Sequence, residues 1–286
     1  MPATTLISVE KLSRLVGTPA CPAIVDLRSD EELAGSSGAM PASIRRVAGE
    51  VTIWGPSLSP HAVVLVCTNG AGESPSVAAW LRHFGAAAEV LEGGIAAWQQ
   101  AGYPLIPAAR LSRSTPEAGS LWVTRARPKV DRIACPWLIR RFVDPAAVFL
   151  FVPPPDVASV VDRFGATAFD VDGVFWSHRD ELCTFDTMLE EFRLGTFDGL
   201  SRLAIIVREA DTAHPEIAPQ AAGLLAASLG LSRMFSDDLE QLEAGMLLYD
   251  AFYRWCRDAV EETHDWVSHQ PRKARRARLE EVASSD

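Results

Sequence analysis

Residues 66–81, VCTNGAGESPSVAAWL, combine residue types that can activate a thiol. Cys67 ends an apolar run, and two glycines follow it before Ser74 and Pro75. Because glycine tolerates positive φ, the loop can turn its backbone N–H groups inward. Ser74 is a preferred N-cap and Pro75 suits the first helical position, so we expect a helix whose N-terminus points at the sulfur. This arrangement favours anions and an ionised thiol, and it predicts a nucleophilic Cys67.

A second interpretation of Cys67 stays open. It could be a small buried residue that packs at the end of a strand. Glu73 bears on the choice, because a carboxylate that faces the loop would repel an anionic sulfur donor such as thiosulfate. Glu73 could equally be a surface residue in the first turn of the helix, where negative charge is favourable.

Two stretches of the second half also combine chemically useful residues. In RARPKVDRIACPWLIRRFVDP (125–145), basic residues gather around Asp131 near the start or kink of a helix at Pro136. They could bind a tetrahedral oxyanion or form a solvated basic face. In AFDVDGVFWSHRDELCTFDTMLEEF (168–192), His178 lies among carboxylates and a cysteine, which could ligate a metal, although a structural histidine is the alternative.

Composition limits the classes of partner. The 286 residues carry a formal net charge of -10, which argues against duplex DNA as a ligand. The basic stretch at 271–281 is expected to be a solvated helical tail. We see neither a signal peptide nor an apolar run long enough for a bilayer, and the five cysteines include no CxxC pair. We therefore expect a cytoplasmic protein with neither membrane nor nucleic acid as its partner.

The elements that must position Cys67 follow from the apolar pattern of the first half. Strands are predicted at 22–28, 61–67 and 88–94, and helices at 75–85 and 95–102. Strands that alternate with helices indicate a parallel sheet with helices on both faces. Ligands bind at the carboxyl ends of such strands, where Cys67 would lie.

The chain is expected to divide into two domains. Pro, Gly and Ser enrichment before residue 121 indicates a linker at 109–120, between a domain at 1–108 and a second at 121–268. Residues 269–286 form a basic and acidic tail. The second domain is predicted to be a mostly helical α+β unit. Its expected strands and helices are at 121–126, 147–153, 184–194, 199–212, 217–231 and 237–260.

The first half resembles the rhodanese family of sulfurtransferases through four motifs in the right order. These are IVDLRSDEE, GSSGAMPASI, VVLVC with the glycine loop, and VLEGGIAAWQQAGYPL. The resemblance implies a rhodanese-like α/β fold and a persulfide formed on Cys67, with a small sulfur donor and a thiol acceptor as partners. Asp26 and Arg28 would brace the loop. The anion-binding loop would consist of Thr68, Asn69, Gly70, Ala71, Gly72, Glu73 and Ser74.

The second half resembles the C-terminal domain of chromate resistance protein B from residue 121 to about 268. The matching segments include WVTRARPKVDRIACPWLIRRFVDP, FDVDGVFWSHRDELCTFDTMLEEF and IVREADT. The resemblance implies a role in chromate response, through sensing or handling the oxyanion. We expect one pocket that binds the oxyanion or a metal ion, while no cofactor is certain. Its predicted lining is Lys129, Asp131, Arg132, Arg140, His178 and Asp211.

Together these features predict a sulfurtransferase that uses thiosulfate or another sulfane-sulfur donor and is coupled to chromate resistance or sensing. The alternative is a non-catalytic oxyanion-binding protein with an inactive rhodanese-like domain.

Overall fold

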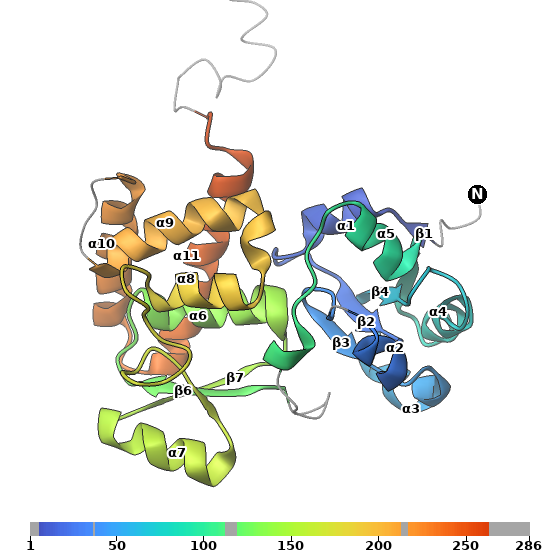
Figure 1. Cartoon of the computed structure of the whole chain (residues 1–286), viewed down its shortest axis with the longest axis horizontal. Coiled ribbons are helices and arrows are strands. Elements are labelled where there is room, and N and C mark those ends of the chain that lie inside the picture. Colours follow the sequence, from blue (N-terminus) through green and yellow to red (C-terminus); the bar gives the residue numbers. More distant parts are fainter. Residues whose placement is uncertain (1–5, 37, 112–118, 213–216, 263–286) are drawn as a thin grey trace, which may run out of the picture.

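The computed structural model describes residues 6–36, 38–111, 119–212 and 217–262 (Figure 1). The strands of the first half form one parallel sheet in the order β1-β5-β4-β2-β3. Their bounds are Leu6–Ile7 (β1), Ala23–Asp26 (β2), Ser43–Arg45 (β3), Ala62–Val66 (β4) and Ala87–Leu91 (β5). Strand β4 lies at the centre of the sheet, so Cys67 follows it at the middle of the carboxyl edge.

Helices cover both faces of this sheet, because alternate residues of a strand point to opposite sides. Val63 and Leu65 of β4 pack with α3 and α4, whereas Val64 and Val66 pack with α1 and α5. The helix bounds are Val9–Leu15 (α1), Asp30–Ala34 (α2), Val51–Trp54 (α3), Ser74–His83 (α4) and Gly94–Gln100 (α5). The predicted α/β architecture, a parallel sheet flanked by helices, is therefore confirmed.

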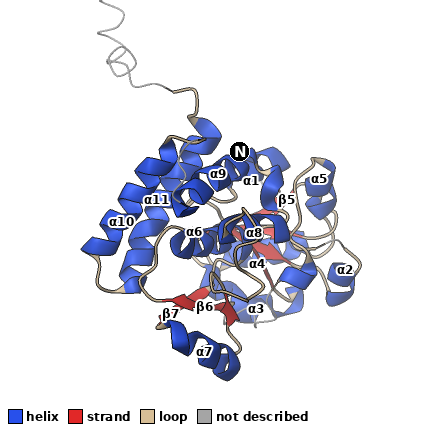
Figure 2. Cartoon of the chain, turned by 60° about the vertical axis from the view of Figure 1, so that its left-hand side comes forward, coloured by secondary structure: helices blue, strands red, loops and turns tan. Residues whose placement is uncertain are grey.

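The second half is built mainly of helices around a small parallel sheet in the order β7-β6-β8 (Figure 2). The strands are Leu121–Arg125 (β6), Val148–Val152 (β7) and Thr167–Ala168 (β8). The helices are Asp131–Leu138 (α6), Val157–Phe164 (α7), Thr184–Glu191 (α8), Asp198–Thr212 (α9), Gln220–Met234 (α10) and Asp238–Asp258 (α11). This agrees with the predicted helical α+β unit, although α7 was not predicted.

Of the two roles expected for Pro136, starting a helix or kinking one, the structure excludes the first. Helix α6 begins at Asp131, so Pro136 lies inside it and does not start it. The next turn, Ile139–Val143, is π-helical. Proline lacks the N–H that a regular helix needs at this point, and a wider turn is one way in which a chain accommodates such a disruption.

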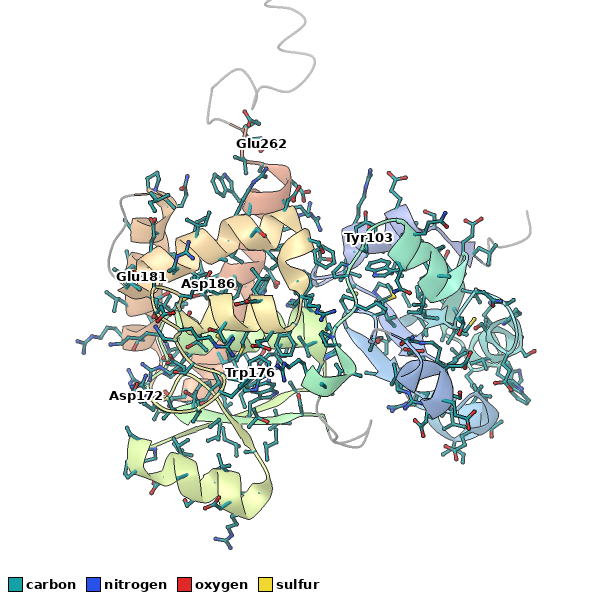
Figure 3. The ribbon with its side chains drawn as sticks, viewed as in Figure 1. Tyr103, Asp172, Trp176, Glu181, Asp186 and Glu262 are labelled. Atoms are coloured by element: carbon teal, nitrogen blue, oxygen red, sulfur yellow. The ribbon has the colours of Figure 1, made fainter. Side chains whose placement is uncertain are left out.

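The two halves share one hydrophobic core. The Phe142 ring packs directly over Gly17, and the Ala42 N–H donates to the Phe142 carbonyl over 2.7 Å. Tyr103, which is labelled in Figure 3, stacks on Phe197 with ring centroids 6.2 Å apart. The relative position of the two sheets is therefore set by buried aromatic packing.

Only part of the predicted linker is described. Its first residues form a short turn, and Arg110 pairs with Glu191 of α8 over 2.6 Å. Residues 112–118 and the predicted tail at 269–286 lie outside the described residues. Within the described ranges, no helix combines the length and apolar character needed to cross a membrane.

Candidate functional site

Cys67 lies directly after β4, in a loop that curls back toward its own sulfur. The side chain is partly buried, and Sγ donates to the Ala71 carbonyl over 3.1 Å. Gly70 and Gly72 have φ of 76° and 69°, a region that side chains disfavour. The glycines thus give the loop the curled conformation that their positions predict.

Two backbone hydrogen bonds from the first turn of α5 hold the loop in place. The Ile95 N–H donates to the Cys67 carbonyl over 2.9 Å, and the Ala96 N–H donates to the Thr68 carbonyl over 3.0 Å. A Cβ on Gly94 would come within 2.6 Å of the Gly70 nitrogen. Gly94 of the VLEGG motif is therefore needed for this close approach.

Helix α4 begins one residue earlier than expected. Ser74 is its first residue and Glu73 precedes it as the N-cap, without a side-chain capping bond. The Ser74 hydroxyl is buried and has no hydrogen-bond partner among the described residues. The Glu73 side chain is exposed. The predicted cap is thus displaced, while Pro75 still lies in the first turn and the N-terminus of α4 follows the loop.

Only some of the loop amides are free to bind an anion. The Ala71 N–H donates to the Asn69 side-chain oxygen over 3.2 Å. Within the described part of the chain, the N–H groups of Gly70, Gly72 and Glu73 donate to no protein acceptor. These amides, together with those of Thr68 and Asn69, which also donate to no acceptor among the described residues, could stabilise a charged sulfur.

A carboxylate from α2 contacts the loop and was not predicted. The Thr68 hydroxyl donates to Glu32 over 2.7 Å, and this bond, followed by the Ser29 N–H, lowers the pKa of Glu32. Ser29 and Glu32 form a reciprocal capping box at the start of α2. The Ser-x-x-Glu spacing in the sequence was the signal for the cap. Nothing in the spacing indicates the contact with Thr68.

Asp26 and Arg28 form a buried ion pair at the end of β2, with closest atoms 2.6 Å apart. The Arg28 guanidinium also donates to the Ser36 hydroxyl over 2.9 Å and to the Gly38 carbonyl over 3.1 Å. Among the described contacts, none joins these two side chains to residues 67–74. Their bracing therefore acts on the segment that follows α2.

In the second half, four side chains from separate elements converge. Asp131 opens α6, Asp170 follows β8, His178 lies in the loop before α8, and Asp211 lies in the last turn of α9. The His178 Nε2 atom is 3.6 Å from Asp131 Oδ2, 3.4 Å from Asp170 Oδ1 and 3.4 Å from Asp211 Oδ2. We call these residues the carboxylate–histidine cluster.

Neighbouring groups fix two of the carboxylates. Asp170 pairs with Arg132 at 3.2 Å and with Arg125 at 3.3 Å, and its Oδ1 accepts the Thr184 hydroxyl over 3.0 Å. Asp131 Oδ2 accepts the Thr184 N–H over 2.7 Å. The start of α8 therefore holds both carboxylates in place.

The cluster concentrates negative charge in a poorly solvated place. Burial raises the pKa of Asp131 well above its ordinary value, and the nearby Asp211 and Asp170 raise it further. Burial, followed by the charge of Asp170, also raises the pKa of Asp211. Carboxylates this close repel one another and would repel an oxyanion, so the cluster favours a cation.

The structure brings together four of the six residues predicted for this pocket, namely Asp131, Arg132, His178 and Asp211, and adds Asp170. Arg140 lies elsewhere: it pairs with Glu243 at 2.6 Å and covers the Phe149 ring. The Lys129 side chain is exposed, with neither an ion pair nor a hydrogen bond to the described residues.

Two cysteines near the cluster are not reactive groups. Cys135 and Cys183 are both buried, and burial, followed by the charge of Asp131, raises the pKa of each thiol well above its ordinary value. They stay protonated at neutral pH and serve as packing residues. Cys183 is the N-cap residue of α8.

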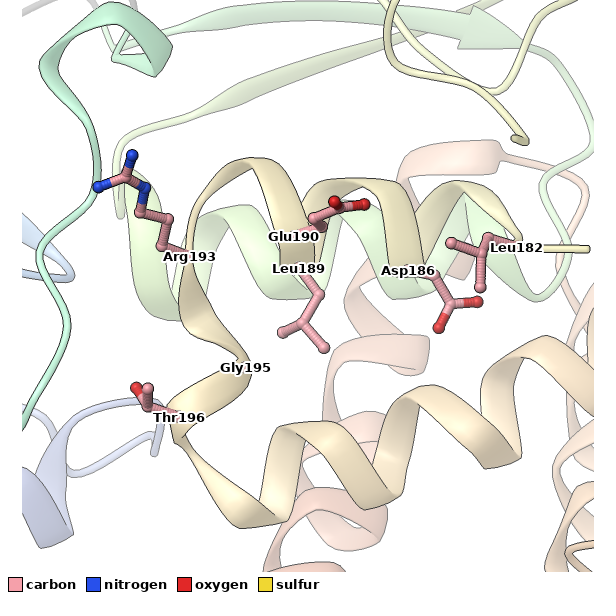
Figure 4. A pocket seen from close by; sticks show the side chains of 7 residues that line it. All are labelled: Leu182, Asp186, Leu189, Glu190, Arg193, Gly195 and Thr196. Carbon is pink, nitrogen blue, oxygen red and sulfur yellow. The ribbon is translucent and has the colours of Figure 1, made fainter. Parts of the chain in front are cut away.

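A separate cavity of about 470 Å³ lies beside α8 (Figure 4). Asp186 at one end accepts the Cys183 N–H and pairs with Arg208 at 3.2 Å. The lining residues are Leu182, Asp186, Leu189, Glu190, Arg193, Gly195 and Thr196. None of the residues predicted for the second-domain pocket lines this cavity.

Comparison with known proteins finds relatives of the second half. Residues 122–256 match the model of the family "ChrB, C-terminal domain". Protein ChrB of Cupriavidus metallidurans is 38% identical over 136 residues, or 47% of this chain. The chain spans about two fifths of that relative, since the match covers 40% of its length. The resemblance carried by the motifs of this half is confirmed.

The first half is similar to several solved structures. A rhodanese-related protein from Thermoplasma volcanium is 24% identical with a TM-score of 0.30, and the match covers 34% of this chain and 93% of that one. A rhodanese-like domain protein from Staphylococcus aureus is 28% identical, with a TM-score of 0.29 and coverages of 33% and 91%. Thiosulfate sulfurtransferase from Pseudomonas aeruginosa is 20% identical, with a TM-score of 0.32 and coverages of 38% and 21%. The α/β fold of this half is established independently by its own sheet topology.

Proposed function

We propose that this chain is a sulfurtransferase that carries sulfane sulfur as a persulfide on Cys67, within a protein of chromate response. The observation that carries the proposal is the position of Cys67, partly exposed at the carboxyl end of the central strand. It lies in the glycine loop, in which several amides donate to no protein acceptor among the described residues, and the start of α4 follows. The link to chromate rests on the likeness of residues 122–256 to the ChrB C-terminal domain.

The reaction has two balanced steps. The Cys67 thiolate attacks the outer sulfur of a donor such as thiosulfate, the S–S bond of the donor breaks, and sulfite leaves with the bonding pair. The product is a Cys67 persulfide anion. An acceptor thiolate then attacks the outer sulfur of this persulfide, and the Cys67 thiolate is released. Neither step needs an external oxidant or reductant.

The loop must change between the thiol and the persulfide. In the thiol form, the Ala71 carbonyl accepts the Sγ proton over 3.1 Å, so this peptide presents its oxygen to the sulfur. An anionic sulfur repels that oxygen. Because Gly72 follows with φ of 69°, the peptide can rotate at little cost and turn the Gly72 N–H toward the charge.

The test is mass spectrometry of the full chain after incubation with thiosulfate, glutathione persulfide or inorganic polysulfide. We expect one added sulfur atom on the peptide that contains Cys67, and its removal by a thiol acceptor. The Cys67→Ser variant should take up none. Cys21→Ser is the matched control, since Cys21 lies in the same half and burial raises its thiol pKa to about 11. Failure of every donor to modify Cys67 would refute the proposal.

A second function is favoured by the acidic groups around the loop. Glu32 contacts Thr68, and the exposed Glu73 precedes α4, so both reduce the attraction for a dianionic donor. On this view the first half is not catalytic, and the protein binds and senses an oxyanion at a site other than the carboxylate–histidine cluster, which would repel it. Calorimetric binding of chromate by the full chain, together with an unmodified Cys67, would support it.

A further inference from the structure

We propose that the carboxylate–histidine cluster binds one divalent transition-metal cation, of the Mn²⁺ or Fe²⁺ type, through Asp131, Asp170, His178 and Asp211. This inference is independent of the chemistry of Cys67. Asp131, Asp170 and His178 each offer one ligand atom, and these atoms lie within 4.8 Å of one another. Asp211 adds a fourth, 3.4 Å from the His178 nitrogen.

The spacing of these atoms suits a common ion. Ligand atoms about 2.1 Å from one metal lie about 3.0 Å apart along an octahedral edge and about 3.4 Å apart along a tetrahedral edge. The His178 Nε2 atom lies 3.4 to 3.6 Å from its three carboxylate neighbours. The carboxylates must move closer to one another to share one ion, because the ligand atoms of Asp131, Asp170 and His178 lie within 4.8 Å and Asp211 is outside that compact group.

An orphaned oxygen gives independent support for a ligand. The Asp131 side chain is 1% exposed, and Oδ2 accepts the Thr184 N–H. Its other oxygen, Oδ1, is buried and has no hydrogen-bond partner among the described residues. A buried carboxylate oxygen without a partner costs free energy, which a cation would recover where it binds Asp131 through Oδ1, alone or together with Oδ2.

The charge balance also favours a cation. Three carboxylates surround His178, while the nearby Arg132 and Arg125 both pair with Asp170. Asp131 and Asp211 have no such arginine partner among the described residues. A divalent ion at the centre would neutralise the remaining repulsion. Direct contact of the His178 ring with the carboxylates is the competing arrangement, and a metal titration separates the two.

The ligand types indicate which cation fits. Carboxylate oxygens suit Mn²⁺ and Mg²⁺, whereas imidazole suits Fe, Zn and other transition metals. Three oxygens with one imidazole nitrogen therefore favour Mn²⁺ or Fe²⁺. The nearby thiols of Cys135 and Cys183 are outside the ligand set, which argues against a thiolate site for Cu(I).

The test uses the chelator-treated full chain and Mn²⁺ as the probe. Free Mn²⁺ is measured by electron paramagnetic resonance during a titration, and we expect one ion bound per chain. His178→Gln and Asp170→Asn should each weaken binding at least tenfold. Asp172→Asn is the matched control: it removes a carboxylate two residues from Asp170, on an exposed side chain outside the cluster, and should bind as the wild type does.

Folding must be monitored because Asp170 also holds Arg132 and Thr184. His178 is 43% exposed, so His178→Gln keeps the test decisive if Asp170→Asn unfolds. Absence of stoichiometric Mn²⁺ binding to the wild-type chain would overturn the proposal. Equal Mn²⁺ affinity in wild type and a folded His178→Gln variant would overturn it as well.

Discussion

Replacement of Gly17 by alanine tests whether the two halves are held together by one core. Gly17 is buried after α1, with φ of 79°. A Cβ at this position would come within 2.6 Å of Phe142 Cε1, in the other half of the chain. Gly102 has φ of 83°, yet nothing lies within 4 Å of its Cβ position. Gly102→Ala is therefore a matched control that carries the backbone strain without the clash.

The expected magnitudes follow from these two costs. Alanine in the left-handed region costs about 1–2 kcal/mol, and both variants should show this loss in the free energy of unfolding. Overpacking against the Phe142 ring adds about 1–3 kcal/mol in Gly17→Ala alone. For a chain of this size, each kcal/mol lowers the thermal midpoint by about 2–4 °C. The clash should thus separate the two variants by roughly 2–12 °C.

Differential scanning calorimetry is the assay, supported by urea unfolding monitored by tryptophan fluorescence. We expect a single transition in the wild type, because the shared core couples the halves. Gly17→Ala should lower that transition or split it in two. The reasoning fails if Gly17→Ala and Gly102→Ala unfold at the same midpoint, since the contact with Phe142 would then contribute nothing.

Three further outcomes are expected. Arg28→Met should lower the free energy of unfolding by about 3–5 kcal/mol in urea, because it leaves Asp26 buried and unpaired, and an unchanged value would contradict this. Glu32→Gln should speed persulfide formation from dianionic thiosulfate roughly two- to five-fold. The gain should hold at every pH above 4.5, where the wild-type carboxylate is charged, and a neutral donor should show no gain. Gly94→Ala should abolish persulfide formation at Cys67 in a protein that still folds, because the added Cβ displaces the loop. Normal labelling of Cys67 in mass spectra would refute this.

The cysteine loop could be predicted from sequence because its determinants are local. The two glycines and Pro75 lie within eight residues of Cys67, and each acts on the backbone next to it. The contact between Glu32 and Thr68 joins residues 36 positions apart. No local sequence pattern encodes a contact across such a separation in the chain, so the position of Glu32 beside the loop follows only from the structure.

The carboxylate–histidine cluster shows the same limit more strongly. Its members extend from Asp131 to Asp211 and lie on four elements. The family resemblance indicated some of them, but it also suggested Arg140, which faces Glu243 instead. Asp170 follows a strand of two residues, too short to be recognised from apolar alternation. Its role in the cluster follows only from the structure, in which Asp170 pairs with Arg132 of α6.

The two sites offer opposite chemistries, and this separation makes both proposals testable in one protein. Sulfane sulfur and a thiolate are soft, whereas carboxylate oxygens prefer harder cations. A metal in the carboxylate–histidine cluster would therefore not depend on the sulfur at Cys67. If the two sites act independently, Cys67→Ser should retain Mn²⁺ binding and His178→Gln should retain the persulfide. Loss of both properties in either variant would instead mean that the shared core transmits the change from one half to the other.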